Sequence, residues 1–519
     1  MTSRLVVHTH QGAVRGRADH GVLVFRGVPY AADTGAEARF LPPRPHRWDG
    51  VQEATGYGLT APQLHPGAAG VPAHLTWIFD SEPRGENCLS LNVHVPASPG
   101  EGPLPVMVFL HGGGFAFGSA SPPGLDGSNL ARQGVVVVTI NHRLNIFGHL
   151  QLGHHHDDYL ESGNAGLLDV EAALEWVQLN INAFGGDANC VTVFGQSGGG
   201  SKVAALMAMP RARGLFHRAI IQSASSMLRF ASQEEAAQNA DAVLHELNVS
   251  ARRLHALNRL PTPEILAAVP AAVRIAGGRD HFRPVVDGQL LPGNPFDERT
   301  AQVSGGVPLI VGWCDTEQRA SFALKPEMYD QTRSTAIARL ATFLGIPRDH
   351  ATTVFDSYTA ARPAESAGDV LALIYGDYRY RRTATSAAER RVASASAPTY
   401  VYTIRWRSSA MEGSLRSPHL MCLPFVFRNV DRAEAFLGSD PDRYRLQDEI
   451  SAAWVRFAAT GNPSPAGSES WPRYDLRSRP TAVFDRDMHI EKDPGSCERE
   501  VLETCPPYSP AEGEGGRRG

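Results

Sequence analysis

The sequence contains very little lysine and no surplus of positive charge. Its lysines are Lys202, Lys325 and Lys492, and 49 basic residues are outweighed by 54 acidic ones, so the formal net charge is −5 over 519 residues. Proteins that hold nucleic acid by bulk charge need an excess of cations to neutralise phosphates. We therefore expect no nucleic-acid partner, and we interpret the many arginines as solvated surface charge.

Long hydrophobic stretches are missing as well. No run of about 18 apolar residues occurs, which is the length that a bilayer-spanning helix needs. Residues 1–16 lack the uninterrupted apolar core of about 7–15 residues that is typical of a signal peptide. These absences predict a cytoplasmic protein that does not associate with a membrane.

Cysteine is scarce and scattered, and no Cys-x-x-Cys pair suggests a zinc site. Cys497 and Cys505 are close enough in sequence to bridge, but free thiols in a reduced compartment are the preferred interpretation. The six cysteines are Cys88, Cys190, Cys314, Cys422, Cys497 and Cys505.

Three consecutive histidines, His154, His155 and His156, raise the question of a metal site. Three adjacent side chains do not easily face one ion, so we expect a surface loop instead. The sequence thus predicts neither a metal nor an organic cofactor.

Short apolar runs alternate with helical patterns along the chain, which predicts an α/β fold with a largely parallel sheet. Most predicted strands are continuously apolar, as expected where helices cover both faces of a sheet. Helices are predicted over 167–181 and 200–209, and two more, over 234–247 and 326–344, should lie outside the sheet as cap insertions. In the last of these, Pro326 suits the first helical position. The predicted strands are 106–110, 135–141, 191–194, 219–222, 308–312 and 400–405.

No repeat or low-complexity linker divides the chain, so residues 1–505 are interpreted as a single catalytic domain. Residues 506–519 are rich in proline, glycine and charge, and we expect a disordered tail there.

The sequence Gly195-Gln-Ser-Gly-Gly199 matches the Gly-x-Ser-x-Gly pattern of a nucleophilic serine. It follows a predicted strand and precedes a predicted helix, which is the context that a sharp strand-to-helix turn requires. Glycines around Ser197 allow the two backbones to approach closely. The start of the helix adds partial positive charge where an anion would develop.

A second glycine-rich motif, His111-Gly-Gly-Gly-Phe115, directly follows the predicted strand 106–110. No Gly-Lys-Ser/Thr follows it, which excludes a P-loop. The pattern instead supplies backbone N–H groups to a tetrahedral oxyanion, together with the N–H after the nucleophile. We assign Gly113, Gly114 and Gly198 as these donors.

A nucleophilic serine needs a base, and the base needs an orienting acid later in the chain. Spacing alone leaves many candidates among 20 histidines and 54 acidic residues. Glu317 and His419 stand out because each comes after a predicted strand.

Taken together with these motifs, several further blocks show that the chain resembles the type-B carboxylesterase family, which includes cholinesterases and bacterial nitrobenzyl-ester hydrolases. The resemblance runs from near the N-terminus to about residue 495. It implies an α/β-hydrolase fold with a large, mostly parallel sheet, flanking helices and helical cap insertions. The blocks are FRGVPYA (25–31), RFLPP (39–43), ENCLSLNV (86–93), GNAGLLD (163–169), FGGD (184–187), PVVDG (284–288) and FAATGNP (457–463).

The resemblance also implies the other catalytic residues. The family's acid lies in a Gly-Thr-Asn-x-x-Glu-Gly stretch that aligns with residues 312–318, which makes Glu317 the acid and leaves Asp315 as its rival. The family's base lies shortly before a Leu-Pro-Phe-Val-Phe string, and His419 precedes that string at 423–427.

Several positions depart from the family pattern. Gln196 replaces a glutamate beside the nucleophile, which should weaken selection for cationic substrates and slightly lower the basicity of the histidine. Gly198 replaces an alanine. Lys202 replaces a small polar residue and Cys422 a glutamate, so the family's pH dependence does not carry over. Cys88 matches a family disulfide position but has no upstream partner.

Three residues complete the predicted site. Ser223 matches a serine that supports the catalytic histidine. Phe115 and Trp77 are candidate pocket residues. Trp77 lies roughly where choline-binding members place an aromatic cation site, but with Gln196 neutral we favour a pocket wall or a core aromatic.

The sequence therefore predicts a serine hydrolase that cleaves small to medium, uncharged or aromatic carboxylic esters through an acyl-enzyme. It should work without a cofactor, as a monomer or homodimer. The alternatives are an acyltransferase, a carbamate or amide hydrolase with the same triad, and a non-catalytic binding protein on this fold.

Overall fold

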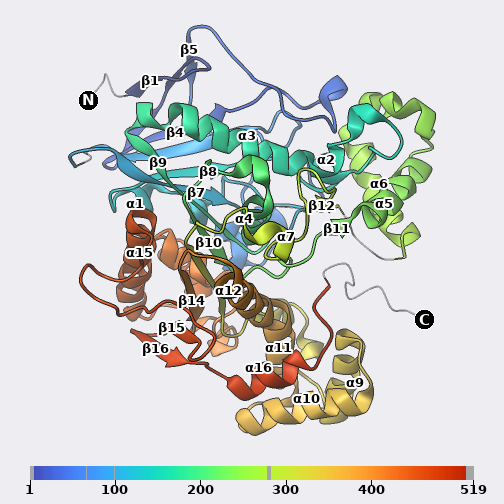
Figure 1. Cartoon of the computed structure of the whole chain (residues 1–519), viewed down its shortest axis with the longest axis vertical. Helices are drawn as coiled ribbons and strands as arrows, with labels where there is room; N and C mark the ends of the chain where they lie inside the picture. Colours follow the sequence, from blue (N-terminus) through green and yellow to red (C-terminus); the bar gives the residue numbers. More distant parts are fainter. Residues whose placement is uncertain (1–4, 66, 99, 278–281, 510–519) are drawn as a thin grey trace.

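A computed structural model describes residues 5–65, 67–98, 100–277 and 282–509 (Figure 1). Its main feature is a sheet of eleven described strands. Their order is β16 (Met488–Lys492), β15 (Pro480–Phe484), β14 (Thr399–Ile404), β13 (Leu309–Cys314), β10 (Arg218–Gln222), β9 (Gly186–Gln196), β7 (Leu104–Leu110), β8 (Val136–Ile140), β6 (Ser90–Pro96), β4 (Val22–Pro29) and β3 (Arg17–Asp19).

The centre of this sheet is parallel and its edges are antiparallel. Consecutive neighbours from β15 to β8 pair in parallel, whereas β16, β6, β4 and β3 pair antiparallel. All six predicted strands lie in the parallel part, which confirms the predicted α/β fold. Two small sheets accompany it: β1 (Val6–His8) with β2 (Ala13–Arg15) and β5 (Val51–Glu53), and β11 (Ala231–Ser232) with β12 (Val285–Val286).

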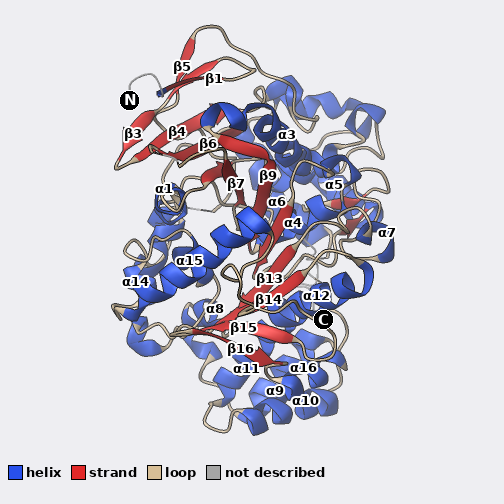
Figure 2. Cartoon of the chain, turned by 60° about the vertical axis from the view of Figure 1, so that its left-hand side comes forward, coloured by secondary structure: helices blue, strands red, loops and turns tan. Residues whose placement is uncertain are grey.

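Helices cover both faces of the sheet, as the continuous apolar strands predict (Figure 2). Along β7, Val106, Val108 and Leu110 pack into one core layer, while Met107 and Phe109 pack into the other. The first layer includes α3 (Ala165–Asn180), α4 (Gly198–Ala208) and α12 (Arg382–Ser394), and the second includes α1 (Ser128–Ala131), α13 (Cys422–Val426), α14 (Glu434–Leu437) and α15 (Asp442–Thr460).

Two groups of helices lie outside these layers, each with an apolar core of its own (Figure 1). The first group contains α2 (Asn145–His149), α5 (Gln233–Glu246) and α6 (Thr262–Ile275). The second contains α9 (Arg333–Leu344), α10 (Arg348–Ala361), α11 (Ala367–Gly376) and α16 (Ser496–Glu503). The short helices α7 (Glu298–Ala301) and α8 (Arg319–Ala323) connect other elements.

The prediction of a helix over 326–344 places its start too early in the chain. Pro326 begins a separate 3₁₀ turn, Pro326–Met328, and α9 begins only at Arg333. Thr332 decides that start, because its side-chain oxygen accepts the backbone N–H of Thr335 as an N-cap.

Residues 506–509 contact the rest of the chain through two hydrogen bonds. Tyr378 donates a hydrogen bond from its hydroxyl to the carbonyl of Pro506 over 2.8 Å, and Arg229 donates to the hydroxyl of Ser509 over 2.9 Å. Residues 510–519 of the predicted disordered tail lie outside the described residues.

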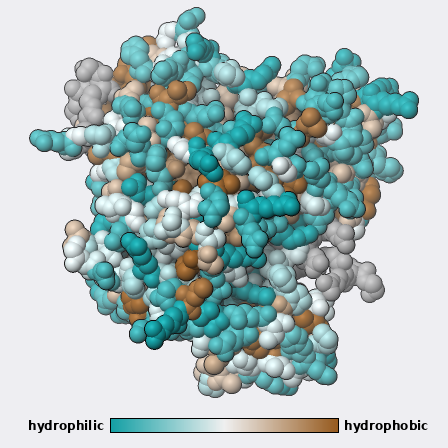
Figure 3. All heavy atoms as spheres, in the orientation of Figure 1, coloured by the Kyte–Doolittle hydropathy of each residue, from teal (hydrophilic) through white to brown (hydrophobic). Residues whose placement is uncertain are grey.

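The lengths and apolar character of the described helices bear on whether the chain crosses a membrane. None of the described helices is both long enough and apolar enough to cross a bilayer. On the face shown in Figure 3, hydrophobic residues are scattered among hydrophilic ones, as on most protein surfaces.

Candidate active site

Five parallel strands end along one edge of the sheet, and their following loops meet there. The register pairs Leu110 with Gly195, Gln196 with Gln222, and Gln222 with Gly312. Because neighbouring parallel strands end at the same level, residues that are far apart in sequence are brought together at this edge. The loops after β7, β9, β10, β13 and β14 carry His111, Ser197, Ser223, Glu317 and His419 respectively.

Ser197 occupies a sharp turn between β9 and α4. Its backbone is in the left-handed region, with φ 57° and ψ −125°, a conformation that a non-glycine residue adopts only when its surroundings impose it. The turn is held by the Ser197 N–H, which donates to the carbonyl of Gln222 over 2.8 Å. A Cβ on Gly195 would lie 2.4 Å from the backbone of Gly199, so the strand and helix need glycine here, as the motif predicts.

The glycine-rich loop after β7 packs against the start of α4. Gly113 and Gly114 have φ values of +89° and +65°, and both line the cavity beside Ser197. A Cβ on Gly198 would lie 2.1 Å from the carbonyl oxygen of Gly114. An alanine at this position therefore does not fit this arrangement, and glycine is a steric requirement.

Glu317 and His419 form a tight pair at the same edge. Oε2 of Glu317 lies 2.5 Å from Nδ1 of His419, and Oε1 accepts the backbone N–H of Cys314 over 2.7 Å. The backbone N–H of His419 also donates to the carbonyl of Glu317 over 3.0 Å. With Nδ1–H donated to a buried carboxylate, the ring keeps its lone pair on Nε2, which is the tautomer that a general base needs.

Asp315, the rival acid, is directed elsewhere. Its carboxylate lies 3.5 Å from the guanidinium of Arg405, and its backbone N–H donates to Ile404. The geometry therefore favours Glu317 as the partner of the imidazole.

Gln196 contacts the other nitrogen of the same ring. Its Nε2 lies 3.1 Å from Nε2 of His419. An amide N–H donates in this contact, so it occupies the lone pair that would also accept the proton of a serine hydroxyl. A glutamate here would instead favour the charged imidazolium.

A cavity of about 500 Å³ opens over Ser197 and His419. Phenylalanine and tyrosine side chains form part of its wall beside aliphatic, glycine and serine residues, and Arg283 is the only arginine, lysine, aspartate or glutamate among the described lining residues. Phe115 lines it as expected. Trp77 does not: it is buried against Phe436 in the core, 5.5 Å between ring centroids, and the neighbouring Ile78 and Phe79 line the cavity instead.

Comparisons with known proteins show the family to which the chain belongs. The profile described as "Carboxylesterase family" matches residues 3–500. The chain is 37% identical to the para-nitrobenzyl esterase of Bacillus subtilis (strain 168), over 96% of this chain and 98% of that protein. A phenmedipham hydrolase of Pseudarthrobacter oxydans is 32% identical, over 91% of this chain and 94% of that one.

Solved structures show the same relationship. A carboxylesterase of Geobacillus stearothermophilus superposes with a TM-score of 0.83 at 33% identity, covering 96% of this chain and all (100%) of that chain. A PNB esterase superposes with a TM-score of 0.80 at 35% identity, covering 96% and 100%. This chain belongs to the carboxylesterase family. It is a serine carboxylic ester hydrolase with the α/β-hydrolase fold, as predicted, and these relatives do not favour the alternatives considered above.

One side chain of this carboxylesterase site was not predicted from sequence. The ring of Tyr380 lies 4.8 Å from the ring of His419 and lines the cavity. It sits on a π-helical segment, Asp377–Arg381, that joins α11 to α12. Such segments often mark functional sites, but no local sequence signal places this turn against a histidine on another loop.

Ser223 and Cys314 lie close to Glu317 at this edge of the sheet. Ser223 Oγ is 3.6 Å from Sγ of Cys314, and no hydrogen bond joins it to His419 among the described residues. Its predicted support of the histidine is therefore indirect at most, through Cys314, whose N–H holds Glu317. All six cysteines are free thiols in the structure.

Proposed function

We propose that Ser197 is the nucleophile of this esterase, His419 its general base and Glu317 the acid that orients the base. The contact of 2.5 Å between Glu317 and His419, at the edge where Ser197 stands on its strained turn, carries this proposal. His419 takes the proton from Ser197 as the hydroxyl oxygen attacks the ester carbonyl carbon. The imidazolium that forms is stabilised by Glu317.

The oxyanion is proposed to be held by the N–H groups of Gly113, Gly114 and Gly198. When the tetrahedral intermediate collapses, the C–O bond to the alcohol breaks and His419 returns its proton to the leaving oxygen. Water then enters, gives a proton to His419 and attacks the acyl carbon. When this second tetrahedral intermediate collapses, the bond between the acyl carbon and Oγ of Ser197 breaks, His419 returns its proton to Oγ, and the acid leaves. No residue in this sequence of steps needs a metal or an organic cofactor.

We propose small to medium uncharged aromatic esters as the substrate class. The cavity wall presents Phe79, Phe115, Phe117, Phe282 and Tyr380, and no carboxylate is among the described lining residues. Aromatic walls favour flat apolar groups, and a cation would find no negative partner there. The name of the Bacillus subtilis relative, a para-nitrobenzyl esterase, supports the same class.

The catalytic assignment is tested with p-nitrophenyl esters from acetate to octanoate, using the wild type beside Ser197→Ala. We expect turnover to fall by on the order of 10⁶-fold in the variant, with labelling of the wild type by a fluorophosphonate at Ser197. Retained hydrolysis in a folded Ser197→Ala protein would place the nucleophile elsewhere.

The substrate class is tested with a matched pair of acetate esters, one of choline and one of 3,3-dimethylbutanol, which has the same shape without the charge. We expect a higher kcat/KM for the neutral ester. A preference for the choline ester would contradict the proposed class while leaving the catalytic assignment intact.

We further propose a cytoplasmic location and a monomeric or homodimeric state. All six cysteines are free thiols, among them Cys314, which precedes Glu317 in the sequence, and Cys422, which follows His419. Free thiols support a reduced compartment. Cell fractionation and light scattering after size exclusion test these two points.

A further inference from the structure

Two adjacent histidines outside the catalytic cavity converge on one carboxylate. Nε2 of His154 lies 3.0 Å, and Nε2 of His155 2.7 Å, from Oδ1 of Asp241. The three donor atoms all lie within 4.8 Å of one another. None of these residues lines the catalytic cavity, so the reaction does not explain the cluster.

Backbone hydrogen bonds and apolar packing, rather than contacts among the three side chains, bring the three ligand atoms together. The chain turns tightly after α2, where the N–H groups of His155 and His156 both donate to the carbonyl of Leu152. In such a turn, successive side chains need not alternate as they do in a strand. Leu152 is buried in the same apolar cluster as Ala240 and Ala242, which flank Asp241 on α5. The turn and the helix are thus packed together, and the donors are preorganised.

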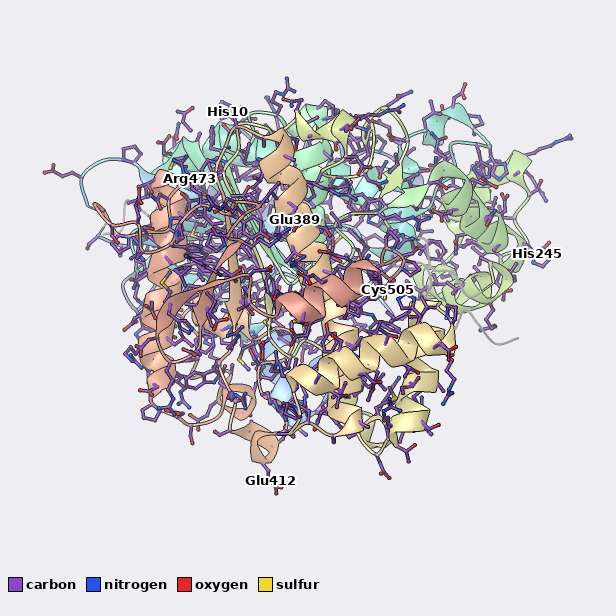
Figure 4. All side chains as sticks on the ribbon, turned by 60° about the horizontal axis from the view of Figure 1, so that its bottom comes forward. His10, His245, Glu389, Glu412, Arg473 and Cys505 are labelled. Atoms are coloured by element: carbon purple, nitrogen blue, oxygen red, sulfur yellow. The ribbon has the colours of Figure 1, made fainter. Side chains whose placement is uncertain are left out.

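The neighbouring histidines do not join the cluster. Nδ1 of His156 accepts the backbone N–H of Asp158 over 3.2 Å and caps the 3₁₀ turn Asp157–Tyr159. His245 lies on the last turn of α5, at the outer edge of the molecule in Figure 4, and is not among the converging donors. Two histidines of the tract therefore face one point and the third does not, whereas the sequence analysis expected a surface loop rather than a metal site.

We propose that His154, His155 and Asp241 bind a divalent transition-metal ion of the zinc or nickel type. Two imidazole nitrogens and one carboxylate oxygen are the ligands that such ions prefer, whereas magnesium and calcium prefer oxygen ligands alone. Tetrahedral zinc, with bonds of about 2.0–2.2 Å, places its ligand atoms roughly 3.3 Å apart. The two nitrogen–oxygen separations measured here need to widen by only a few tenths of an ångström.

The protonation and charge of the three side chains also suit a metal cation. For both contacts to be hydrogen bonds, each Nε2 must carry a proton directed at the same carboxylate oxygen. A divalent cation can take the place of these two protons: each neutral ring then carries its proton on Nδ1 and gives the lone pair of Nε2 to the ion. The side chains of His154, His155 and Asp241 are 31%, 20% and 56% exposed, so the ion can enter from solvent and complete its shell with water.

The bound ion would tie the turn at 152–156 to α5. The α5–α6 unit is followed directly by the segment that contributes Phe282 and Arg283 to the cavity wall. An ion that binds the folded protein but not the unfolded chain raises stability by mass action. We therefore expect the ion to stabilise the packing of this turn against α5 without taking part in ester hydrolysis.

The test uses the full chain, freed of any histidine tag and treated with a chelator. Calorimetric titration with zinc chloride should show a single saturable site per chain, and cobalt chloride should give a visible absorption band of tetrahedral type. Magnesium chloride should give no binding at this site.

The variants His155→Gln and Asp241→Asn should each weaken zinc binding by at least about 10–100-fold, and zinc should raise the Tm of the wild type but not of these variants. His156→Gln is the matched control, since it removes the neighbouring ring and should bind zinc as the wild type does. Ester hydrolysis by all three variants should match the wild type, which shows that they fold. Absence of zinc binding by the wild type would overturn the proposal. So would unchanged affinity in both His155→Gln and Asp241→Asn.

Discussion

Nζ of Lys202 donates a hydrogen bond to the carbonyl oxygen of His111 over 3.1 Å, beneath the glycine-rich loop of the active site. The lysine is 1% exposed and lies 5.5 Å from the ring centroid of Phe115. His111, His142 and His149 surround it, and burial holds the pKa of each of them below its usual value. Of these four groups, the lysine is therefore the one that keeps its proton to the highest pH.

Burial lowers the pKa of Lys202 from 10.5 to about 7. Between pH 7 and 10.5 the unfolded chain holds a proton on this lysine that the folded chain has released, so the free energy of unfolding rises with pH in this range. Below pH 7 the lysine is charged in both states, and the full cost of burying that charge opposes folding. We expect Lys202→Met to raise the free energy of unfolding by about 2–4 kcal/mol at pH 6 and by less at pH 9. Urea unfolding at both pH values measures this. Lys492→Met, at an exposed lysine on β16, is the control and should show no such pH dependence.

Glu317 and Asp315 are two residues apart, and the structure pairs only the first with His419. Glu317→Gln should therefore lower kcat by about 10⁴-fold, because the amide no longer stabilises the imidazolium or its tautomer. Asp315→Asn should remain within a few-fold of the wild type. Steady-state kinetics on one p-nitrophenyl ester compares the two, and the reverse order of effects would show that Asp315 is the acid.

Gln196 donates to Nε2 of His419, so a carboxylate at this position would act directly on the base. Gln196→Glu should move the acid limb of the kcat/KM profile to higher pH by about one unit, since a negative neighbour favours the protonated, inactive imidazole. It should also improve kcat/KM for the choline ester relative to its neutral dimethylbutyl analogue. A profile that does not move would mean that the amide has no contact with the base in solution.

Gly198 has no room for a side chain, because a Cβ would lie 2.1 Å from the carbonyl of Gly114. Gly198→Ala must push the glycine-rich loop away from Ser197, and we expect kcat to fall by about 10²-fold as oxyanion donors are displaced. Gly306→Ala is the control, since a Cβ there would meet nothing within 4 Å. Equal kinetics for the two variants would show that the loop adjusts freely.

Tyr380 packs its ring 4.8 Å from the ring of His419. Tyr380→Ala should lower kcat by about 10-fold, because the imidazole loses the wall that limits its rotation and positioning errors reduce rate strongly. Tyr380→Phe keeps the ring and should retain most activity. If both variants lose activity equally, the hydroxyl rather than the ring is what matters.

The sequence alone determined those features whose physical cause is local. A serine on a strained turn needs glycine on both sides, so the motif around Ser197 is readable without a structure. Parallel strands buried on both faces are continuously apolar, which is why β7, β8, β9, β10, β13 and β14 could all be predicted. The resemblance to a family then singled out Glu317 and His419 among many acids and histidines.

Tertiary structure decided every feature that depends on which side chains meet across long stretches of chain. Glu317 and His419 are 102 residues apart, and only the common edge of β13 and β14 brings them within 2.5 Å. The ring of Tyr380, the core position of Trp77 and the steric need for Gly198 follow from packing between separate elements. His155 and Asp241 are 86 residues apart, and they meet only because Leu152 anchors a turn to the helix α5. Such contacts are set by sheet register and core packing, which no local pattern of residues encodes.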